Sequence, residues 1–181
     1  MEREEAPVLN LPNILTIIRL ILVGVFYYVF NIPDHMAALA IFLVAGATDV
    51  LDGYIARKYN MITDLGKLLD PLADKLLLIV ALFCLYSAGN VPLVFPVLAT
   101  VKEIAMVVGG ALLLTREHKV VYSKSIGKIA AGTFFLGVVA SFFKACLDPF
   151  HIILLSVGLA LSVAAMCSYA FENIFRGKAE E

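Results

Sequence analysis

Four aspartates lie close together in a stretch of the chain that is otherwise strongly apolar: Asp49, Asp52, Asp70 and Asp74. Asp49 and Asp52 are three residues apart and Asp70 and Asp74 are four apart, so each pair shares one face of a helix. An ionised side chain at the centre of a membrane helix costs about 2.5 to 3.5 kcal/mol on insertion scales, and such residues are functional by default. The cluster therefore predicts a functional site.

Carboxylates that converge at one depth repel one another unless a cation neutralises them. An all-oxygen set of ligands suits Mg²⁺ or Mn²⁺, and magnesium usually keeps open positions for substrate phosphates. Two ions can also hold both sides of a phosphoryl displacement. The aspartates therefore predict one or two divalent ions and phosphate-transfer chemistry.

Residues beside the aspartates fit the same chemistry. Arg57 offers a planar guanidinium group, which can bind a diphosphate through two parallel hydrogen bonds. Gly53 and Gly66 lack side chains where a nucleotide wedged between helices would approach the backbone. Ala56 continues the helix face of Asp49 and Asp52. These residues extend the predicted site from a metal centre to a nucleotide site.

The elements that carry the site are predicted from the apolar pattern. Of 181 residues, 61% are hydrophobic, and the mean hydropathy of +0.93 is too high for a water-soluble domain. The apolar residues form blocks of about twenty, which is the length of a helix that crosses about 30 Å of hydrocarbon. We expect an all-α polytopic membrane protein with one domain over residues 1–181. Its six transmembrane helices form one bundle and cover about 14–30, 36–56, 65–88, 91–115, 126–145 and 150–175.

The distribution of basic residues predicts the orientation, because cytoplasmic loops collect Lys and Arg. Basic residues surround the second and fourth connections and follow the last helix, whereas the opposite side has only Lys144. Both termini, including residues 1–12, and the aspartates are therefore expected on the cytoplasmic side, with a bacterial inner membrane as the host. A net charge of −1 argues against a nucleic-acid partner.

Eight of these residues stand in the register of a known signature, D-x2-D-G-x2-A-R-x8-G-x3-D-x3-D. The matching residues are Asp49, Asp52, Gly53, Ala56, Arg57, Gly66, Asp70 and Asp74. The chain resembles the CDP-alcohol phosphotransferase family, and the predicted six-span topology agrees with that family. The resemblance implies that the hydroxyl of an acceptor alcohol attacks the β-phosphorus of a CDP-linked lipid and that CMP leaves.

The resemblance also implies a role for each matched residue. All four aspartates bind the metal, and Asp74 is also the general base that takes the proton of the acceptor hydroxyl. Gly53 and Arg57 contact the CDP group, whereas Ala56 and Gly66 leave room for cytidine and ribose. Two residues outside the signature are expected to contact the CDP-lipid as well: Thr63, through a phosphate, and Asn13.

The segments LPNILT at 11–16, with Arg19, and LDPLADK at 69–75 resemble phosphatidylglycerophosphate synthases, and cardiolipin synthases share both. The favoured substrates are therefore CDP-diacylglycerol and glycerol-3-phosphate, a small phosphorylated alcohol. The phosphate of glycerol-3-phosphate must be bound by cationic side chains. Lys124 and Lys128 are the best candidates, and Arg116 and Lys119 are weaker ones.

The fourth span departs from the family pattern. Lys102 and Glu103 stand where an Arg-Glu pair is expected, and Gly109 and Gly110 stand where an arginine is expected about seven residues later. Because Lys102 and Glu103 are adjacent, they should point in different directions and each pair with another helix, or else serve the acceptor site. The acceptor is therefore open, and a cardiolipin synthase or another acceptor specificity remains the alternative.

Two rival functions belong to other classes. A cation transporter also carries intramembrane aspartates, and an intramembrane prenyltransferase also binds magnesium, although its aspartate spacing differs and it usually has more spans. The sequence leaves open the choice of metal and the oligomeric state, but small residues on helix faces make a homodimer reasonable. Arg19 is expected to reach the interface with its charged group, and His151 to be solvated.

Overall fold

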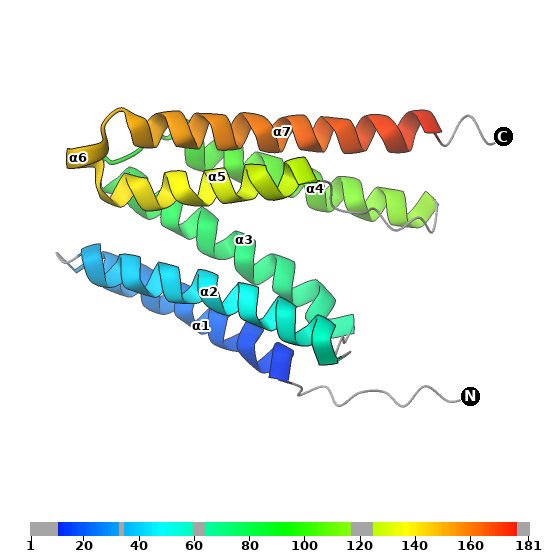
Figure 1. Cartoon of the computed structure of the whole chain (residues 1–181), viewed down its shortest axis with the longest axis horizontal. Coiled ribbons are helices and arrows are strands. Elements are labelled where there is room, and N and C mark those ends of the chain that lie inside the picture. The colour runs from blue at the N-terminus through cyan, green and yellow to red at the C-terminus, as the bar shows by residue number, and fades with distance from the viewer. Residues whose placement is uncertain (1–10, 33–34, 60–63, 117–124, 177–181) are drawn as a thin grey trace. The chain divides into compact units, whose positions relative to one another are not determined.

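The computed structural model describes residues 11–32, 35–59, 64–116 and 125–176, and every regular element in these ranges is an α-helix (Figure 1). Within the helices, the side chains of 11–13, 15, 49–72, 74, 110–116, 125 and 169–176 are not described. The helices are α1 (Leu11–Phe30), α2 (His35–Tyr59), α3 (Asp64–Ser87), α4 (Val94–Arg116), α5 (Ser125–Phe142), α6 (Lys144–Leu147) and α7 (Phe150–Arg176). The predicted all-α class is confirmed for the described residues.

Six of the helices are long, and they coincide with the six predicted apolar blocks to within a few residues. The fifth block is interrupted before its predicted end, because α5 ends at Phe142 and the single turn of α6 follows before α7. At the end of α3, Gly89 has a φ of +72°, which is the left-handed conformation that favours glycine. Its N–H donates to the carbonyl of Tyr86 at 2.8 Å and closes the turn.

The chain divides into two compact units, Met1–Cys84 and Leu85–Glu181. In the first unit, α1 and α2 pack side by side as an antiparallel hairpin (Figure 1). Aromatic rings of the two helices pack against each other in this hairpin. The ring centroids of Phe26 and Phe42 are 6.1 Å apart, and those of Phe30 and His35 are 4.6 Å apart. The two contacts set the register of α1 against α2 to within one helical turn.

In the second unit, α5 and α7 pack along each other, and α4 also contacts α7. Two glycines allow the close approach of α5 and α7. A Cβ atom at Gly137 would lie 2.8 Å from the backbone nitrogen of Leu155, and one at Gly158 would lie 2.6 Å from that of Phe134. Small residues at helix interfaces are typical of membrane proteins, in which backbones can approach closely only without side chains between them.

Polar groups close the end of this unit where α4 and α7 begin. Asn90 donates from Nδ2 to the carbonyl of Ser141 at 3.1 Å, and Lys144 donates to the carbonyl of Gly89 at 2.6 Å. The expected solvation of His151 is wrong, because only 1% of this residue is exposed and its Nε2 lies 3.1 Å from the carbonyl oxygen of Asn90. Packing of α7 against the turn at Asn90 buries the ring.

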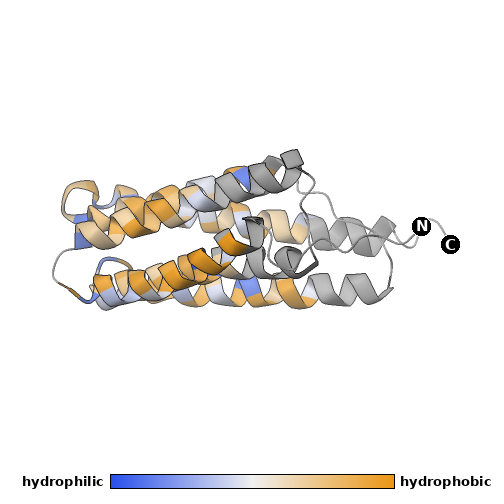
Figure 2. Cartoon of the chain, turned by 90° about the horizontal axis from the view of Figure 1, so that it is seen from below, coloured by the Kyte–Doolittle hydropathy of each residue, from blue (hydrophilic) through white to orange (hydrophobic). Residues whose placement is uncertain are grey.

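Apolar residues dominate the outer surface of the long helices, and hydrophilic ones gather at the connections (Figure 2). Among the described residues, Phe150–Ser168 is a stretch long and apolar enough to cross a membrane. Shorter apolar stretches lie in four other helices, at Thr16–Phe30, His35–Thr48, Lys75–Ser87 and Ile126–Phe142. One candidate span is weak support on its own, so the count of six spans stays a prediction.

Candidate functional site

The signature residues lie on two consecutive helices joined by a short connection. Asp49, Asp52, Gly53, Ala56 and Arg57 belong to the last four turns of α2, which ends at Tyr59. The second set belongs to the first three turns of α3, which begins at Asp64, and consists of Gly66, Asp70 and Asp74. Both stretches have a helical backbone, as the spacing predicted, while these side chains lie outside the described residues.

The buried face of α2 points toward the first aspartate pair along the helix. Ala38, Phe42 and Ala45 are fully buried, and their spacing of four and three residues marks one stripe of the helix. The same alternation of four and three continues to positions 49, 52 and 56. The positions of Asp49 and Asp52 are therefore continuous, by helical spacing, with the face that packs inside the first unit.

A comparable stripe leads to the second aspartate pair. Ala73, Leu77 and Ala81 are buried on α3, with 2% of Leu77 exposed and none of the two alanines. Position 70 precedes Ala73 by three residues, and position 74 precedes Leu77 by three. Both aspartates of α3 thus occupy positions next to its buried face, one helical turn before residues of known burial.

Lys102 and Glu103 form an ion pair with each other through Nζ and Oε1, with 15% and 17% of their side chains exposed. The expectation that adjacent residues must point apart is wrong here, because two long side chains can bend toward each other from neighbouring positions. The pairing offsets part of the cost of placing both charges inside an apolar helix.

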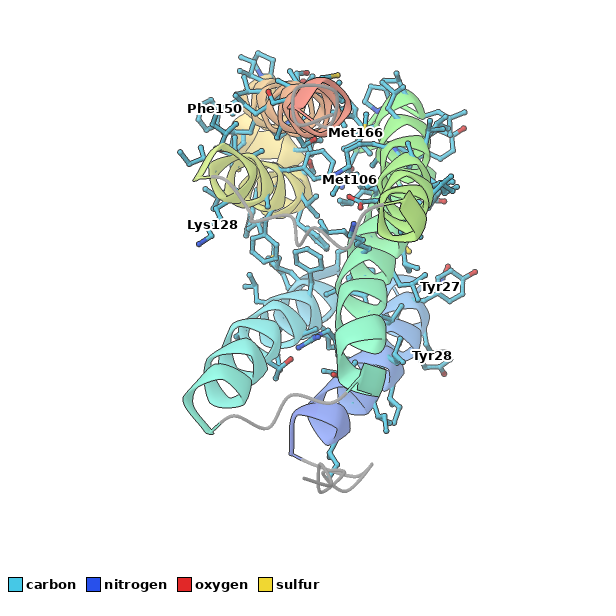
Figure 3. All side chains as sticks on the ribbon, turned by 90° about the vertical axis from the view of Figure 1, so that its right-hand side faces the viewer. Tyr27, Tyr28, Met106, Lys128, Phe150 and Met166 are labelled. Atoms are coloured by element: carbon cyan, nitrogen blue, oxygen red, sulfur yellow. The ribbon has the colours of Figure 1, made fainter. Side chains whose placement is uncertain are left out.

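The proposed acceptor residues are described only in part. Lys128 lies in the first turn of α5, and its exposed side chain projects away from the helix (Figure 3). Lys124, Lys119 and Thr63 lie outside the described residues. Asn13 belongs to the first turn of α1 and Arg116 ends α4, but neither side chain is described.

The donor set fits a hard divalent ion. Among the side chains that the structure describes, no group of three His, Cys, Asp or Glu residues gathers at one place. The four signature aspartates are not among those side chains, and in the sequence they form two pairs with helical spacing, Asp49 with Asp52 and Asp70 with Asp74. Because all their donors are carboxylate oxygens, they suit Mg²⁺ or Mn²⁺ and not a soft metal.

Comparison with known proteins decides the family. A sequence profile described as CDP-alcohol phosphatidyltransferase matches residues 9–166, which include all eight signature residues. The chain belongs to the CDP-alcohol phosphatidyltransferase family. It is therefore an enzyme that transfers a phosphatidyl group.

Several relatives of this phosphatidyltransferase carry one name, CDP-diacylglycerol–glycerol-3-phosphate 3-phosphatidyltransferase. The protein of that name from Bacillus subtilis is 32% identical over 91% of this chain and 95% of its own length. That from Pseudomonas fluorescens is 44% identical over 49% of this chain and 47% of its own. A fusion protein from Schizosaccharomyces pombe, named cardiolipin synthase (CMP-forming) and mitochondrial hydrolase, is 38% identical over 55% of this chain but only 17% of its own length.

One residue of this enzyme has a different environment from the one expected. Arg19 does not reach the interface with its charged group, because none of this residue is exposed, and neither is Thr16 one turn before it. Arg19 stands seven residues before the fully buried Phe26 and therefore shares its helix face, which explains the burial.

Proposed function

We propose that this phosphatidyltransferase transfers the phosphatidyl group of CDP-diacylglycerol to glycerol-3-phosphate and releases CMP. The observation that carries the proposal is the similarity, over nearly the full length of both chains, to a relative named for this donor and this acceptor. Other relatives with the same name are 44% and 36% identical over 49% and 60% of this chain. The product is a phosphatidylglycerol phosphate, made on the route to phosphatidylglycerol.

The proposed metal site consists of Asp49, Asp52, Asp70 and Asp74. Its support is the helical backbone through all four positions and their continuity with the buried faces of α2 and α3. One or two Mg²⁺ or Mn²⁺ ions, when bound, would neutralise the diphosphate and the charge that develops on the leaving CMP. This role explains why an apolar protein carries four acidic side chains at membrane depth.

The remaining residues bind and orient the substrates. Arg57 binds the diphosphate, Gly53 lets the CDP group approach the backbone, and Ala56 and Gly66 leave space for cytidine and ribose. Asp74 accepts the proton of the acceptor hydroxyl as that oxygen bonds to the β-phosphorus and the bond to CMP breaks. Additional contacts with the CDP-lipid are assigned to Thr63 and Asn13, and contacts with the acceptor phosphate to Lys124 and Lys128.

We also propose that six helices span a bacterial inner membrane, with both termini and the aspartates on the cytoplasmic side. Tyrosines support one boundary of the bilayer, because this residue type favours membrane interfaces. Tyr27 and Tyr28 are 59% and 72% exposed at the end of α1, and both project outward (Figure 3). Tyr86 is 41% exposed in the last turn of α3. All three belong to the helix ends remote, along the chain, from the aspartates.

The first test is CMP release by the purified protein in detergent with CDP-diacylglycerol and Mg²⁺. Glycerol-3-phosphate, phosphatidylglycerol, inositol phosphate and serine are compared as acceptors. Turnover with glycerol-3-phosphate alone is the expected result. Turnover with phosphatidylglycerol would make the enzyme a cardiolipin synthase. The similarity to the Schizosaccharomyces pombe fusion protein, which is named a cardiolipin synthase, is the reason to include this acceptor. Absence of turnover with every acceptor would refute the proposed donor and acceptor.

A further inference from the structure

Arg19 is a buried charged residue, so an oppositely charged group should lie next to it. It lies in the third turn of α1 and is fully buried. An arginine keeps its charge at every physiological pH, and its guanidinium group presents donors in a rigid fork that matches a carboxylate. Buried charges in proteins are paired or hydrogen-bonded, because an unpaired charge away from water is strongly destabilising. The partner should therefore be an acidic group at the level of Arg19.

The aromatic contact between α1 and α2 fixes that level. Phe26 of α1 and Phe42 of α2 lie opposite each other, with ring centroids 6.1 Å apart. Arg19 precedes Phe26 by seven residues on α1, and Asp49 follows Phe42 by seven residues on α2. Both steps lead away from the turn of the hairpin. Seven residues advance a helix by about 10.5 Å and bring the chain back to nearly the same face, with a drift of only about 20°.

Because the two helices are antiparallel, moving away from the turn proceeds in the same direction along both. The contact of Phe26 with Phe42 places position 19 level with position 49, and that of Phe30 with His35 places it level with position 46. Asp49 therefore lies within one helical turn of the level of Arg19 and is the first acidic residue of α2. The next acidic position on that face is Asp52, which lies about 4.5 Å further along. Asp49 is the acidic residue of α2 that the register places nearest the level of Arg19.

We propose that Arg19 is a positioning residue for Asp49: its guanidinium group binds one carboxylate oxygen and so directs the other toward the metal. The inference rests on the proposed metal site. Ligating carboxylates are commonly held by hydrogen bonds from outside the metal's own ligands, and removing such a partner typically weakens metal affinity by 10–100-fold. Arg19 would add this support from a third helix, outside the signature on α2 and α3.

The direction of the effect separates positioning from simple electrostatics. Removing a positive charge near a cation site should by itself tighten cation binding. If Arg19 instead orients Asp49, its loss should weaken binding, because the carboxylate must then be ordered when the ion arrives. Weaker binding in a variant with one positive charge fewer therefore has no purely electrostatic explanation.

The test measures Mn²⁺ binding to the full-length protein in detergent from the electron paramagnetic resonance signal of the free ion, with no substrate present. Arg19→Met should raise the dissociation constant on the order of tenfold. Arg19→Lys keeps the charge but loses the fork, so it should give a smaller loss in the same direction. Ile18→Ala, beside Arg19 but 42% exposed, is the control and should leave Mn²⁺ affinity unchanged.

Double variants identify the partner. In an Asp49→Asn background, Arg19→Lys should have no further effect on Mn²⁺ affinity, whereas in an Asp70→Asn background its full effect should remain. Unchanged or tighter Mn²⁺ binding in both Arg19 variants would overturn the proposal. If Arg19→Met does not fold, the result for Arg19→Lys decides the test. A wild-type protein that binds no Mn²⁺ would instead refute the metal site of the proposed function.

Discussion

The close approach of α5 and α7 makes a prediction with a calculable size. Replacing Gly158 by alanine adds a Cβ atom 2.6 Å from the nitrogen, 2.7 Å from the Cα and 2.8 Å from the Cβ of Phe134. Non-bonded carbon atoms prefer separations of about 3.5–4.0 Å. Since two of the atoms met by the new methyl group belong to the backbone, no side-chain rotation can relieve the overlap. The two helices must move apart.

The size of the effect follows from two opposing terms. Overpacking of this kind typically costs about 1–3 kcal/mol, and contact with a rigid backbone favours the upper end. The higher helix propensity of alanine returns about 1 kcal/mol. The net loss of about 2 kcal/mol should lower the melting temperature by roughly 4–8 °C for a chain of this length.

Heat denaturation in detergent, followed by far-ultraviolet circular dichroism, measures this loss. The chain has no tryptophan, so the helical signal is a more direct probe than intrinsic fluorescence. Gly137→Ala should shift the melting temperature in the same direction, because its Cβ would meet the backbone nitrogen of Leu155 at 2.8 Å. Gly132→Ala is the matched control, since it lies on the same helix as Gly137 with nothing within 4 Å of its Cβ.

The control should melt at the wild-type temperature or slightly above it, because only the helix-propensity term applies. If Gly158→Ala and Gly137→Ala were as stable as Gly132→Ala, the contact between α5 and α7 would be looser than the structure shows. The reasoning from close backbone approach would then be wrong.

Three further outcomes are expected. Asp74→Asn should abolish CMP release but leave CDP-diacylglycerol binding intact, and retained turnover would rule out Asp74 as the base. Lys128→Ala should raise the KM for glycerol-3-phosphate by roughly tenfold, the value of one charge-assisted hydrogen bond, without changing the KM for CDP-diacylglycerol. His151→Phe keeps the ring volume but leaves the partly buried carbonyl of Asn90 without its histidine partner. It should therefore cost about 1–3 kcal/mol, seen as a lower melting temperature, while CMP release below that temperature is unchanged.

Helix positions were predictable because they depend on local patterns. The apolar blocks set the length of each helix, and turn residues such as Gly89 and Asn90 ended them. The helix break at Phe142, which the apolar pattern did not predict, has no glycine or polar run to mark it in the sequence. The break before α6 instead coincides with tertiary contacts of Lys144, whose ammonium group donates to the carbonyl of Gly89.

Side-chain environments were less predictable because they depend on which helices meet. His151 stands next to a proline turn, and its burial depends on a carbonyl 61 residues away in the sequence, that of Asn90. The mutual ion pair of Lys102 and Glu103 likewise depends on how two flexible side chains bend. Among the glycines of α5, spacing alone could not show that Gly137 meets a backbone whereas Gly132 does not.

The candidate site is a prediction from residue types and spacing, and the structure describes only its backbone. Helical backbone at positions 49–57 and 66–74 agrees with that expectation. The role of α1 was not predictable in this way, since an arginine near the start of a span usually reaches the interface with its charged group. Only the burial of Arg19, together with the level fixed by Phe26 and Phe42, connects α1 to the position of Asp49.

The charge balance of the aspartates connects catalysis to stability. Two carboxylates about 6 Å apart repel by roughly 3 kcal/mol at an effective dielectric constant of 20. Summed over every pair in a set of four, this repulsion is comparable to the whole stability of a typical domain, about 5–15 kcal/mol. If the four carboxylates converge as proposed, the set can persist only with cations beside it. Arg57 and Arg19 would supply permanent ones, and the metal would supply the rest, so the ions that prepare the diphosphate for transfer should also hold α2 and α3 together.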